Sequence, residues 1–317
     1  MENRENLVSL SAQQLINQVR RVVVGKDQVL LWVLAAMLAG GHILLEDIPG
    51  VGKTTMALAF SKVMGLQCNR VQFTPDVLPS DVTGYSILDQ AAGKMVYQPG
   101  AVLCNLFLAD ELNRATSRTQ SALLEAMEEG QVTVDGVSHP IPKPFTVIAT
   151  QNPTGASGTQ LLPDSQMDRF MVRLSLGYPS RKDEMNMVLS RQKGDPLAAL
   201  TPMFTASQME HLRGLVSQTY IGEAVVSYII DLIDATRHHE DILRGASPRA
   251  TLALTSLAKS IAQLRDRDYV IPGDVKEVFI TTIAHRLILT PKAESQSKTP
   301  ETVLQQILER VPAPKLR

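Results

Sequence analysis

The sequence predicts an α/β fold in which a parallel sheet is sandwiched by helices, followed by an all-helical second domain. Two observations carry this prediction. Up to about residue 180, short apolar β-prone runs alternate with helical segments, which is typical of a parallel sheet covered on both faces. After Tyr178-Pro179-Ser180 only helical patterns follow. We therefore expect one domain over residues 1–195 and a second over residues 196–317, with a cleft between them.

The expected elements follow in chain order. Apolar β-prone runs predict strands at 43–46, 69–73, 103–109, 145–150 and 171–176. The helices between them include 26–39, 53–64 and 117–129. In the second domain, Gly and Pro turn signals separate helices expected at 181–193, 206–219, 223–238, 247–265, 273–286 and 301–310. Residues 293–298 are expected to form a flexible link before the last helix.

Two irregular insertions interrupt this alternation, and both predict β-hairpins. Residues 84–100 contain two β-prone runs that turn at Ala92-Gly93-Lys94. In residues 131–138, alternating β-prone residues flank an Asp135-Gly136 turn, which is a strong hairpin signal. Each hairpin could extend an edge of the main sheet or project from it as a functional insertion.

A phosphate-binding loop is the most informative motif. Residues 47–54 match its pattern in every position but the first, where Asp47 replaces the usual Gly, and they lie between a predicted strand and a predicted helix. Gly50 and Gly52 would let backbone N–H groups converge on phosphate oxygens. Lys53 would reach the β- and γ-phosphates, and the Thr54 hydroxyl would hold Mg²⁺. The alternative is a chance Gly-Lys-Thr match in which Asp47 caps a helix.

Polar side chains end two further predicted strands. An apolar run ends at Asp110 and Glu111, and carboxylates at the carboxyl end of a parallel strand can serve a metal site. Asp110 would orient the Mg²⁺ shell, and Glu111 would polarise the water that attacks the γ-phosphate. Asn152, after the run 145–150, could position that water or sense the γ-phosphate. The alternatives are a helix cap for the two acids and a simple turn after the second strand.

Composition limits the class of protein. The 317-residue chain has 44% apolar and 20% charged residues, which is ordinary for a soluble globular protein. Its net charge of −1 argues against broad binding to nucleic acid. No apolar run reaches about 18 residues and the start is polar, so we expect no membrane span, no signal peptide and a cytoplasmic location. Cys68 and Cys104 have no neighbours at ligand spacing and are expected to be buried structural thiols.

Longer stretches around these motifs resemble a known family. Residues 109–115, Ala-Asp-Glu-Leu-Asn-Arg-Ala, continued by residues 120–132, resemble the signature of the MoxR family of AAA+ ATPases, in the helix-2-insert clade. Residues 45–54 also resemble a form of the loop found in that family, so Asp47 is interpreted as a family variation. The resemblance extends from about Val24 to Val275. It implies a P-loop NTPase core with a helical lid, and it identifies the hairpins as the helix-2 insert and the pre-sensor-1 hairpin.

The resemblance also implies roles for individual residues. Val24 and Gly25 would pack on the adenine, and Asn152 would be sensor 1. Arg169 would be the arginine finger that points at the γ-phosphate bound by the neighbouring subunit, with a structural salt bridge to a nearby acid as the alternative. The expected nucleotide-binding residues are Val24, Gly25, Pro49, Gly50, Val51, Gly52, Lys53, Thr54 and Thr55, and the expected metal ligands are Thr54 and Asp110.

Arg249 would be sensor 2 by the same resemblance, and its local sequence also favours an anionic partner. Ser247 is a good N-cap and Pro248 suits the first helical position, so Arg249 falls in the first turn of a helix. A cation there opposes the helix dipole, and nucleotide phosphates would compensate it. The alternative is a solvated surface arginine.

The implied function is Mg²⁺-dependent ATP hydrolysis in a homo-oligomeric ring, expected to be a hexamer. The ring would remodel or activate protein clients in a chaperone-like manner, with partners that carry von Willebrand factor A domains. One alternative is a DNA-directed motor, which the hairpin tips disfavour because they are neither strongly basic nor aromatic. Another is a nucleotide-gated scaffold with little turnover, which Glu111 and Asn152 disfavour. The client itself has no signature in the sequence.

Overall fold

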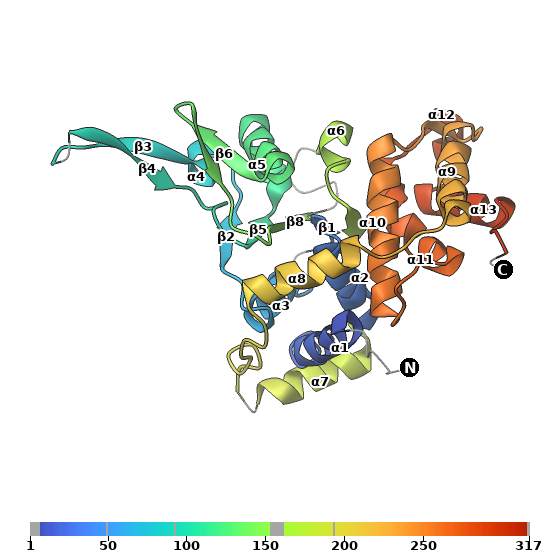
Figure 1. The fold of residues 1–317 in the computed structure, drawn as a ribbon, viewed down its shortest axis with the longest axis horizontal. Coiled ribbons are helices and arrows are strands. Elements are labelled where there is room, and N and C mark those ends of the chain that lie inside the picture. The colour runs from blue at the N-terminus through green and yellow to red at the C-terminus, as the bar shows by residue number, and fades with distance from the viewer. Residues whose placement is uncertain (1–6, 49, 92, 153–161, 193, 316–317) are drawn as a thin grey trace.

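A parallel sheet of five strands forms the centre of the molecule (Figure 1). The computed structural model describes residues 7–48, 50–91, 93–152, 162–192 and 194–315. The strand order is β2-β5-β8-β1-β9, and every neighbouring pair is parallel. The strands are β1 (Ile43–Glu46), β2 (Cys68–Gln72), β5 (Leu106–Asp110), β8 (Thr146–Gln151) and β9 (Val172–Leu174). The five strands predicted from the sequence are therefore confirmed, with shifts of a few residues at their ends.

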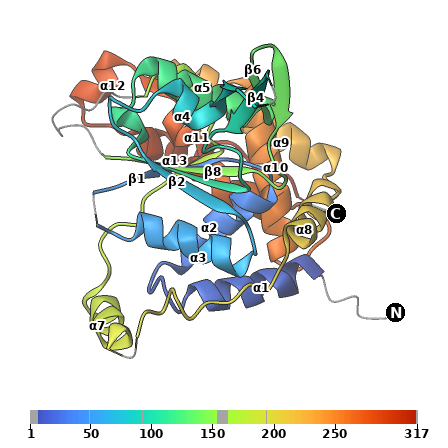
Figure 2. The same ribbon diagram turned by 90° about the vertical axis from the view of Figure 1, so that its left-hand side faces the viewer.

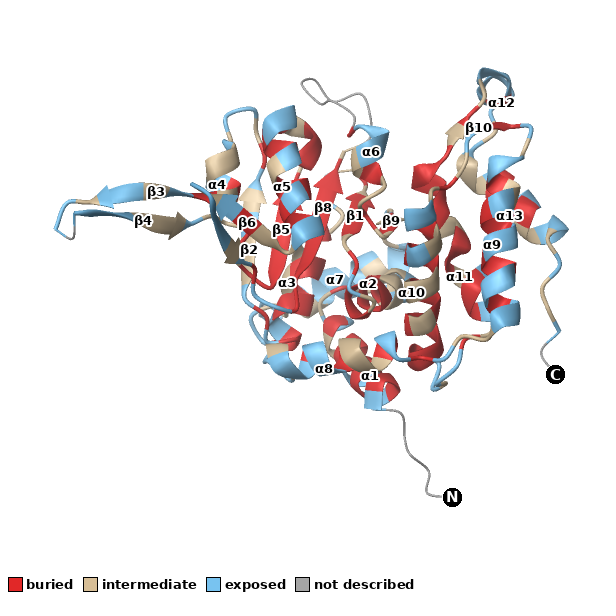
Figure 3. Cartoon of the chain, turned by 45° about the horizontal axis from the view of Figure 1, so that its top comes forward, coloured by how far each residue is buried: buried red, intermediate tan, exposed pale blue. Residues whose placement is uncertain are grey.

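Helices cover both faces of this sheet, as Figure 2 shows. Alternate residues of β1 enter different cores: Leu45 packs with α1 (Leu7–Val19), α2 (Asp27–Leu38) and α3 (Lys53–Val63), whereas Leu44 packs with the opposite helices. Those opposite helices are α4 (Pro79–Thr83) and α5 (Ser117–Glu129). The central strands β5 and β8 are buried along their whole length, because both of their faces are covered (Figure 3).

The register brings the carboxyl ends of the central strands level with one another. Ala109 of β5 pairs with Ala149 of β8, and Leu44 of β1 pairs with the same Ala149. The residues that follow these pairs therefore lie at one edge of the sheet, which is where open parallel sheets bind ligands. Asp110 and Thr150 are the next residues on β5 and β8.

Both predicted hairpins are present, and each forms a two-stranded sheet of its own. They consist of β3 (Gly84–Asp89) with β4 (Lys94–Pro99), and of β6 (Gln131–Val134) with β7 (Val137–Pro140). The first hairpin extends far from the core in Figure 1. The rings of Tyr97 and His139 stack at 3.7 Å between centroids and join the two hairpins. Because neither hairpin pairs with the five-stranded sheet, the alternative that they extend its edge is wrong.

The second half of the chain is mostly helical, as predicted. Its α-helices are α6 (Asp164–Met167), α7 (Arg181–Arg191), α8 (Ala206–Ser217), α9 (Glu223–Arg237), α10 (Pro248–Leu264), α11 (Pro272–Ile283), α12 (Pro291–Ser295) and α13 (Pro300–Arg310). Two details of the prediction are wrong. A small antiparallel sheet joins β10 (Ile242–Arg244) to β11 (Ile288–Leu289). Part of the expected flexible link is α12, where Thr290 caps the helix and Ala293 is fully buried.

The lid helices and the sheet domain share one apolar core. Helix α8 is fixed to the sheet domain by Arg213, which donates hydrogen bonds to the Met37 carbonyl (2.8 Å) and the Thr146 hydroxyl (2.6 Å). Burial of this guanidinium lowers the pKa of Arg213 to about 10. The domain boundary near residue 195 stays a prediction. Among the described residues, no helix combines the length and apolar character that a bilayer crossing requires.

Candidate functional site

The phosphate-binding loop connects β1 to α3. Gly50 and Gly52 have φ of 87° and 97°, in a region that L side chains rarely adopt, so glycine is required at both positions. Lys53 is the first residue of α3 and is only 7% exposed, and its Nζ donates to the Asp47 carbonyl at 2.6 Å. Burial lowers the pKa of Lys53, and the nearby acids Asp47, Asp110 and Glu111 oppose this effect. Pro49 lies outside the described residues.

Asp47 fastens this loop to the segment that follows β9. Its Oδ2 accepts hydrogen bonds from the backbone N–H groups of Leu176 (2.5 Å) and Gly177 (2.9 Å) and from the Ser175 hydroxyl (3.0 Å). The carboxylate therefore caps no helix; it joins the carboxyl ends of β1 and β9. A sequence pattern could not identify this role, because the partners lie 128 to 130 residues away along the chain.

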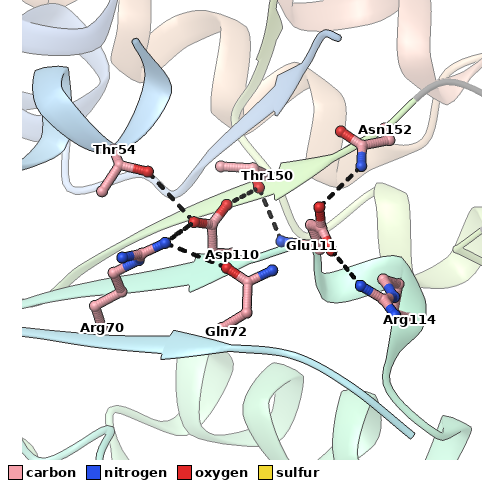
Figure 4. A network of polar contacts seen from close by, with 8 residues as sticks. All are labelled: Thr54, Arg70, Gln72, Asp110, Glu111, Arg114, Thr150 and Asn152. Carbon is pink, nitrogen blue, oxygen red and sulfur yellow. Dashed lines mark hydrogen bonds and ion pairs between the residues drawn. The ribbon is translucent and has the colours of Figure 1, made fainter. Parts of the chain in front are cut away.

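Asp110 is the centre of a polar network at the end of β5 (Figure 4). Its Oδ2 accepts from the Thr54 hydroxyl at 3.3 Å and from Arg70 at 2.8 Å, and its Oδ1 accepts from the Thr150 hydroxyl at 2.6 Å. Arg70 and Thr150 come from the flanking strands β2 and β8, and sequence reasoning missed both. Thr150 follows an apolar run, whereas Arg70 lies among other polar residues, and neither pattern indicates which strands are neighbours in the sheet.

Glu111 is held in a strained and well-defined position. Its backbone has φ of 55° and ψ of 47°, a left-handed conformation that costs a non-glycine residue on the order of 1 kcal/mol or more. Asn152 donates to its Oε1 at 3.1 Å, and Arg114 donates to its Oε2 at 2.8 Å. The Glu111 N–H donates to the Thr150 hydroxyl at 2.9 Å. The predicted base and the predicted sensor are thus in direct contact.

A cavity of about 800 Å³ adjoins the loop. Gly50, Gly52 and Thr55 line one part of it, and the apolar run 22–24 lines another. This volume suits a nucleotide, with the apolar wall available for the base. A Cβ on Gly25 would lie 2.2 Å from a carboxylate oxygen of Asp183 on α7, so only glycine permits this close approach. Val24 and Val51 also line the cavity.

Arg169 and Arg249 lie side by side, and like Lys53, Asp110 and Glu111 they are not among the residues that line this cavity. Both form ion pairs with Glu128 near the end of α5, in the case of Arg169 at 3.2 Å. Arg169 also donates to the Leu124 carbonyl at 2.5 Å. The two arginines therefore form one cluster, apart from the residues that surround Asp110. The salt bridge considered as an alternative for Arg169 exists, and its partner is Glu128.

Buried residues of the lid fix the position of this cluster. Arg286 is almost fully buried and donates to Asp168 Oδ1 (2.7 Å) and to the Phe170 carbonyl (2.8 Å), the two neighbours of Arg169. Burial lowers the pKa of Arg286, and Asp168 opposes this shift. The Ser247 hydroxyl caps α10 and donates to Asp168 Oδ2 at 3.0 Å. The same carboxylate thus holds the segment of Arg169 and the helix that carries Arg249.

Known proteins match this chain over both of its parts. Residues 42–172 match the ATPase family associated with various cellular activities (AAA), and residues 234–307 match the AAA lid domain. Chaperone MoxR1 of Mycobacterium tuberculosis is 38% identical over 313 residues, which cover 96% of this chain and 82% of that protein. The chain belongs to the MoxR family of AAA+ ATPases. The resemblance noted in the sequence is confirmed.

Further relatives of this MoxR-family chain agree with its fold. YeaC of Bacillus subtilis is 42% identical over 299 residues, which cover 94% of this chain and 93% of that protein. The crystal structure of a presumed ATPase from Cytophaga hutchinsonii is 36% identical and has a TM-score of 0.91, with 97% of this chain and 96% of that chain covered. An MCM homolog from Methanopyrus kandleri, at 18% identity and a TM-score of 0.61, is similar in fold alone.

The residues of this MoxR-family site suit a nucleoside triphosphate with Mg²⁺. Thr54 and Asp110 could hold the ion, because their oxygens lie 3.3 Å apart at the edge of the loop. The described residues contain no group of three or more His, Cys, Asp or Glu that could hold a metal ion alone. Mg²⁺ usually takes one or two protein oxygens and completes its shell with phosphates and water. The ion would neutralise charge that develops on the phosphates.

Proposed function

We propose that this MoxR-family protein is an Mg²⁺-dependent ATPase that assembles into a ring of six copies. The ring would use hydrolysis to remodel or activate protein clients, together with a partner that carries a von Willebrand factor A domain. The observation that carries this proposal is a pair of contacts next to the phosphate-binding loop (Figure 4). Thr54 donates to Asp110, and Asn152 donates to the adjacent Glu111.

Each residue of this network has a role in hydrolysis. Lys53 and the loop N–H groups would hold the β- and γ-phosphates, with Thr54 and Asp110 on Mg²⁺. Glu111 would accept a proton from the attacking water, and Asn152 would keep the carboxylate aimed at it. Arg114 holds the other carboxylate oxygen, so the pose of Glu111 is defined before substrate binds.

A ring is supported by the separation between the two clusters. Arg169 and Arg249 are partly exposed, and among the described residues neither forms a hydrogen bond or an ion pair with Lys53, Asp110 or Glu111. A phosphoryl-transfer site commonly uses an arginine to stabilise charge in the transition state, either from the same chain or from another. We propose that this pair acts on the nucleotide of the neighbouring copy, so that each complete site contains residues of two subunits.

A protein client is supported by the chemistry of the long hairpin. Tyr85, Ile87, Leu88 and Met95 of the β3–β4 hairpin are all exposed, Leu88 and Met95 to 60%. Apolar side chains suit a polypeptide better than a phosphate backbone, which basic residues would bind. The M. tuberculosis relative is named a chaperone, which agrees with this proposal.

The proposal is tested by affinity capture of Glu111→Gln protein with ATP and Mg²⁺. This change keeps the shape of the side chain and removes the base, so a ring with bound ATP and client should accumulate. Lys53→Ala protein, which cannot hold the phosphates, is the control and should retain no client. Equal rates of hydrolysis by the wild type and Glu111→Gln would contradict the role of Glu111.

A further inference from the structure

Glu128 bridges the two arginines that we propose to act between subunits. Its Oε2 lies 3.2 Å from Arg169, and its Oε1 is paired with Arg249. The arginines come from distant parts of the chain, one between α6 and β9 and one in the first turn of α10. A single carboxylate therefore holds together two guanidinium groups that would otherwise repel each other.

The helix that carries Glu128 gives no local reason for an acid at this position. Glu128 is the penultimate residue of α5, where the helix dipole disfavours a negative charge. The two arginines compensate this cost. All three side chains are partly exposed, to 40% for Glu128, 30% for Arg169 and 44% for Arg249, so another molecule can reach them.

Glu128 and a phosphate would compete for the same donors. Carboxylates and phosphates both accept paired hydrogen bonds from guanidinium groups, and a terminal phosphate carries more negative charge. Ion pairs that are this exposed stabilise a protein only weakly, so the two contacts can be exchanged. With Glu128 in place, however, an arriving phosphate must also approach a carboxylate of like charge.

We propose that Glu128 is an internal competitor: it occupies Arg169 and Arg249 in the isolated subunit and yields them to the terminal phosphate of a nucleotide bound by a second copy. This inference rests on the proposed action of the two arginines between subunits. Glu128 then sets the protein concentration at which nucleotide-bound copies associate. The Arg169 segment keeps its place when Glu128 leaves, because the Leu124 carbonyl and Arg286 still hold it.

The test compares Glu128→Gln with Glu129→Gln. Both substitutions remove one negative charge from the end of α5, but Glu129 is an exposed neighbour outside the bridge. Sedimentation velocity with Mg²⁺ and the slowly hydrolysed analogue ATPγS would measure the concentration of half-assembly. We expect Glu128→Gln to lower that concentration several-fold, by up to about tenfold, relative to Glu129→Gln. An unchanged or raised concentration would overturn the inference, and thermal unfolding of both variants would verify that they fold.

Arg169→Ala and Arg249→Ala, measured in the same way, separate the two proposals. If these variants assemble as the wild type does, the action of the arginines between subunits is wrong. If they assemble poorly while Glu128→Gln shows no gain, only the competitor role of Glu128 is wrong.

Discussion

The loop-side cluster around Asp110 and the arginine cluster around Glu128 are built in different ways. Asp110, Glu111 and Thr150 end buried strands of one sheet, and their positions follow from its register. The arginine cluster combines α5, the segment between α6 and β9 and the first turn of α10, and its side chains are partly exposed. The first cluster needs only one domain, whereas the second needs the lid.

The two clusters suit different parts of an ATPase site. The carboxyl ends of strands that helices cover on both faces are rigid, and they hold the water-activating Glu111 in a fixed position. The arginines instead lie on a surface whose shape depends on contacts between lid and core, through Arg286, Asp168 and Ser247. We infer that the loop-side cluster binds and orients the nucleotide within one subunit, and that the arginine cluster reports whether a neighbour is in place.

The largest effect is expected when the arginine cluster loses Arg169. Arg169→Ala should lower kcat by roughly 10³-fold or more, since an arginine of this type can stabilise the transition state by that amount. Binding of ATP by the same subunit should not change, because Arg169 contacts Leu124 and Glu128 and not the phosphate-binding loop. Steady-state hydrolysis and equilibrium nucleotide binding measure the two quantities. Arg244→Ala, which removes another partly exposed lid arginine, is the control. A matching loss of ATP affinity in Arg169→Ala would place both clusters in one site.

A somewhat smaller effect is expected when the loop-side cluster loses its base. Glu111→Gln should lower kcat by about 10²- to 10⁴-fold, which is typical of a positioned general base. The dissociation constant for ATP should stay within a few-fold of the wild type, because Lys53 and the loop still hold the phosphates. Single-turnover hydrolysis measures the loss of rate, and nucleotide titration measures the dissociation constant for ATP. An Asn152→Ala variant should lose less activity, since it removes only one contact of the carboxylate.

Arg286 joins the lid to the segment that carries Arg169, and its loss should lower the stability of the protein. Arg286→Met leaves Asp168 without its buried partner and should lower the free energy of unfolding by about 3 kcal/mol. The double variant with Asp168→Asn should recover part of this loss, because no unpaired charge remains. Denaturant titration measures both. Equal destabilisation of the single and double variants would mean that the ion pair does not account for the effect.

The smallest effect concerns pH and two buried histidines, His42 and His285. Burial lowers the pKa of His42 to about 4, and its Nδ1 accepts from the Val147 N–H, which favours the neutral ring. Burial also holds the pKa of His285 well below its usual value. The unfolded chain takes up protons below about pH 6.5 while the folded chain does not, so stability falls as the pH falls.

Each histidine should therefore reduce the free energy of unfolding by about 1 kcal/mol between pH 7.5 and 5.5. Denaturant titrations of His42→Gln and His285→Gln at both pH values should each show a smaller decline than the wild type. An identical decline in all three proteins would mean that other groups cause the pH dependence.

The sequence predicted the loop-side cluster better than the arginine cluster, for a physical reason. Glu111 and Asn152 follow apolar runs, and the carboxyl ends of parallel strands lie on the same side of the sheet whatever the strand order. By contrast, Arg70 and Thr150 meet Asp110 across 40 residues, and Arg286 meets Asp168 across 118. Such partners depend on strand order and lid packing, which local patterns do not encode. Glu128 lay within the family signature, but its bridge to two arginines required the three-dimensional structure.

The contrast between local patterns and contacts of distant segments also explains which details of the fold were not predicted. Helices and buried strands have periodic patterns within one segment, and those that were predicted lie within a few residues of their expected positions. Helix α1 was not predicted. The β10–β11 pair is too short for such a pattern, and its strands are separated by two long helices. Helix α12 has only five residues, and the burial of Ala293 against the lid gives it a place that its polar sequence does not suggest.

Mixing two inactive variants tests most directly whether the two clusters act in different subunits. Arg169→Ala subunits retain the loop-side cluster, and Lys53→Ala subunits retain the arginine cluster. At a total protein concentration at which both variants assemble, and at a ratio of one to one, random assembly in a ring should form about a quarter of all sites from one intact half of each kind. ATPase activity should recover on mixing toward about this fraction of the wild-type rate. No recovery at any ratio would mean that the two clusters do not act in different subunits.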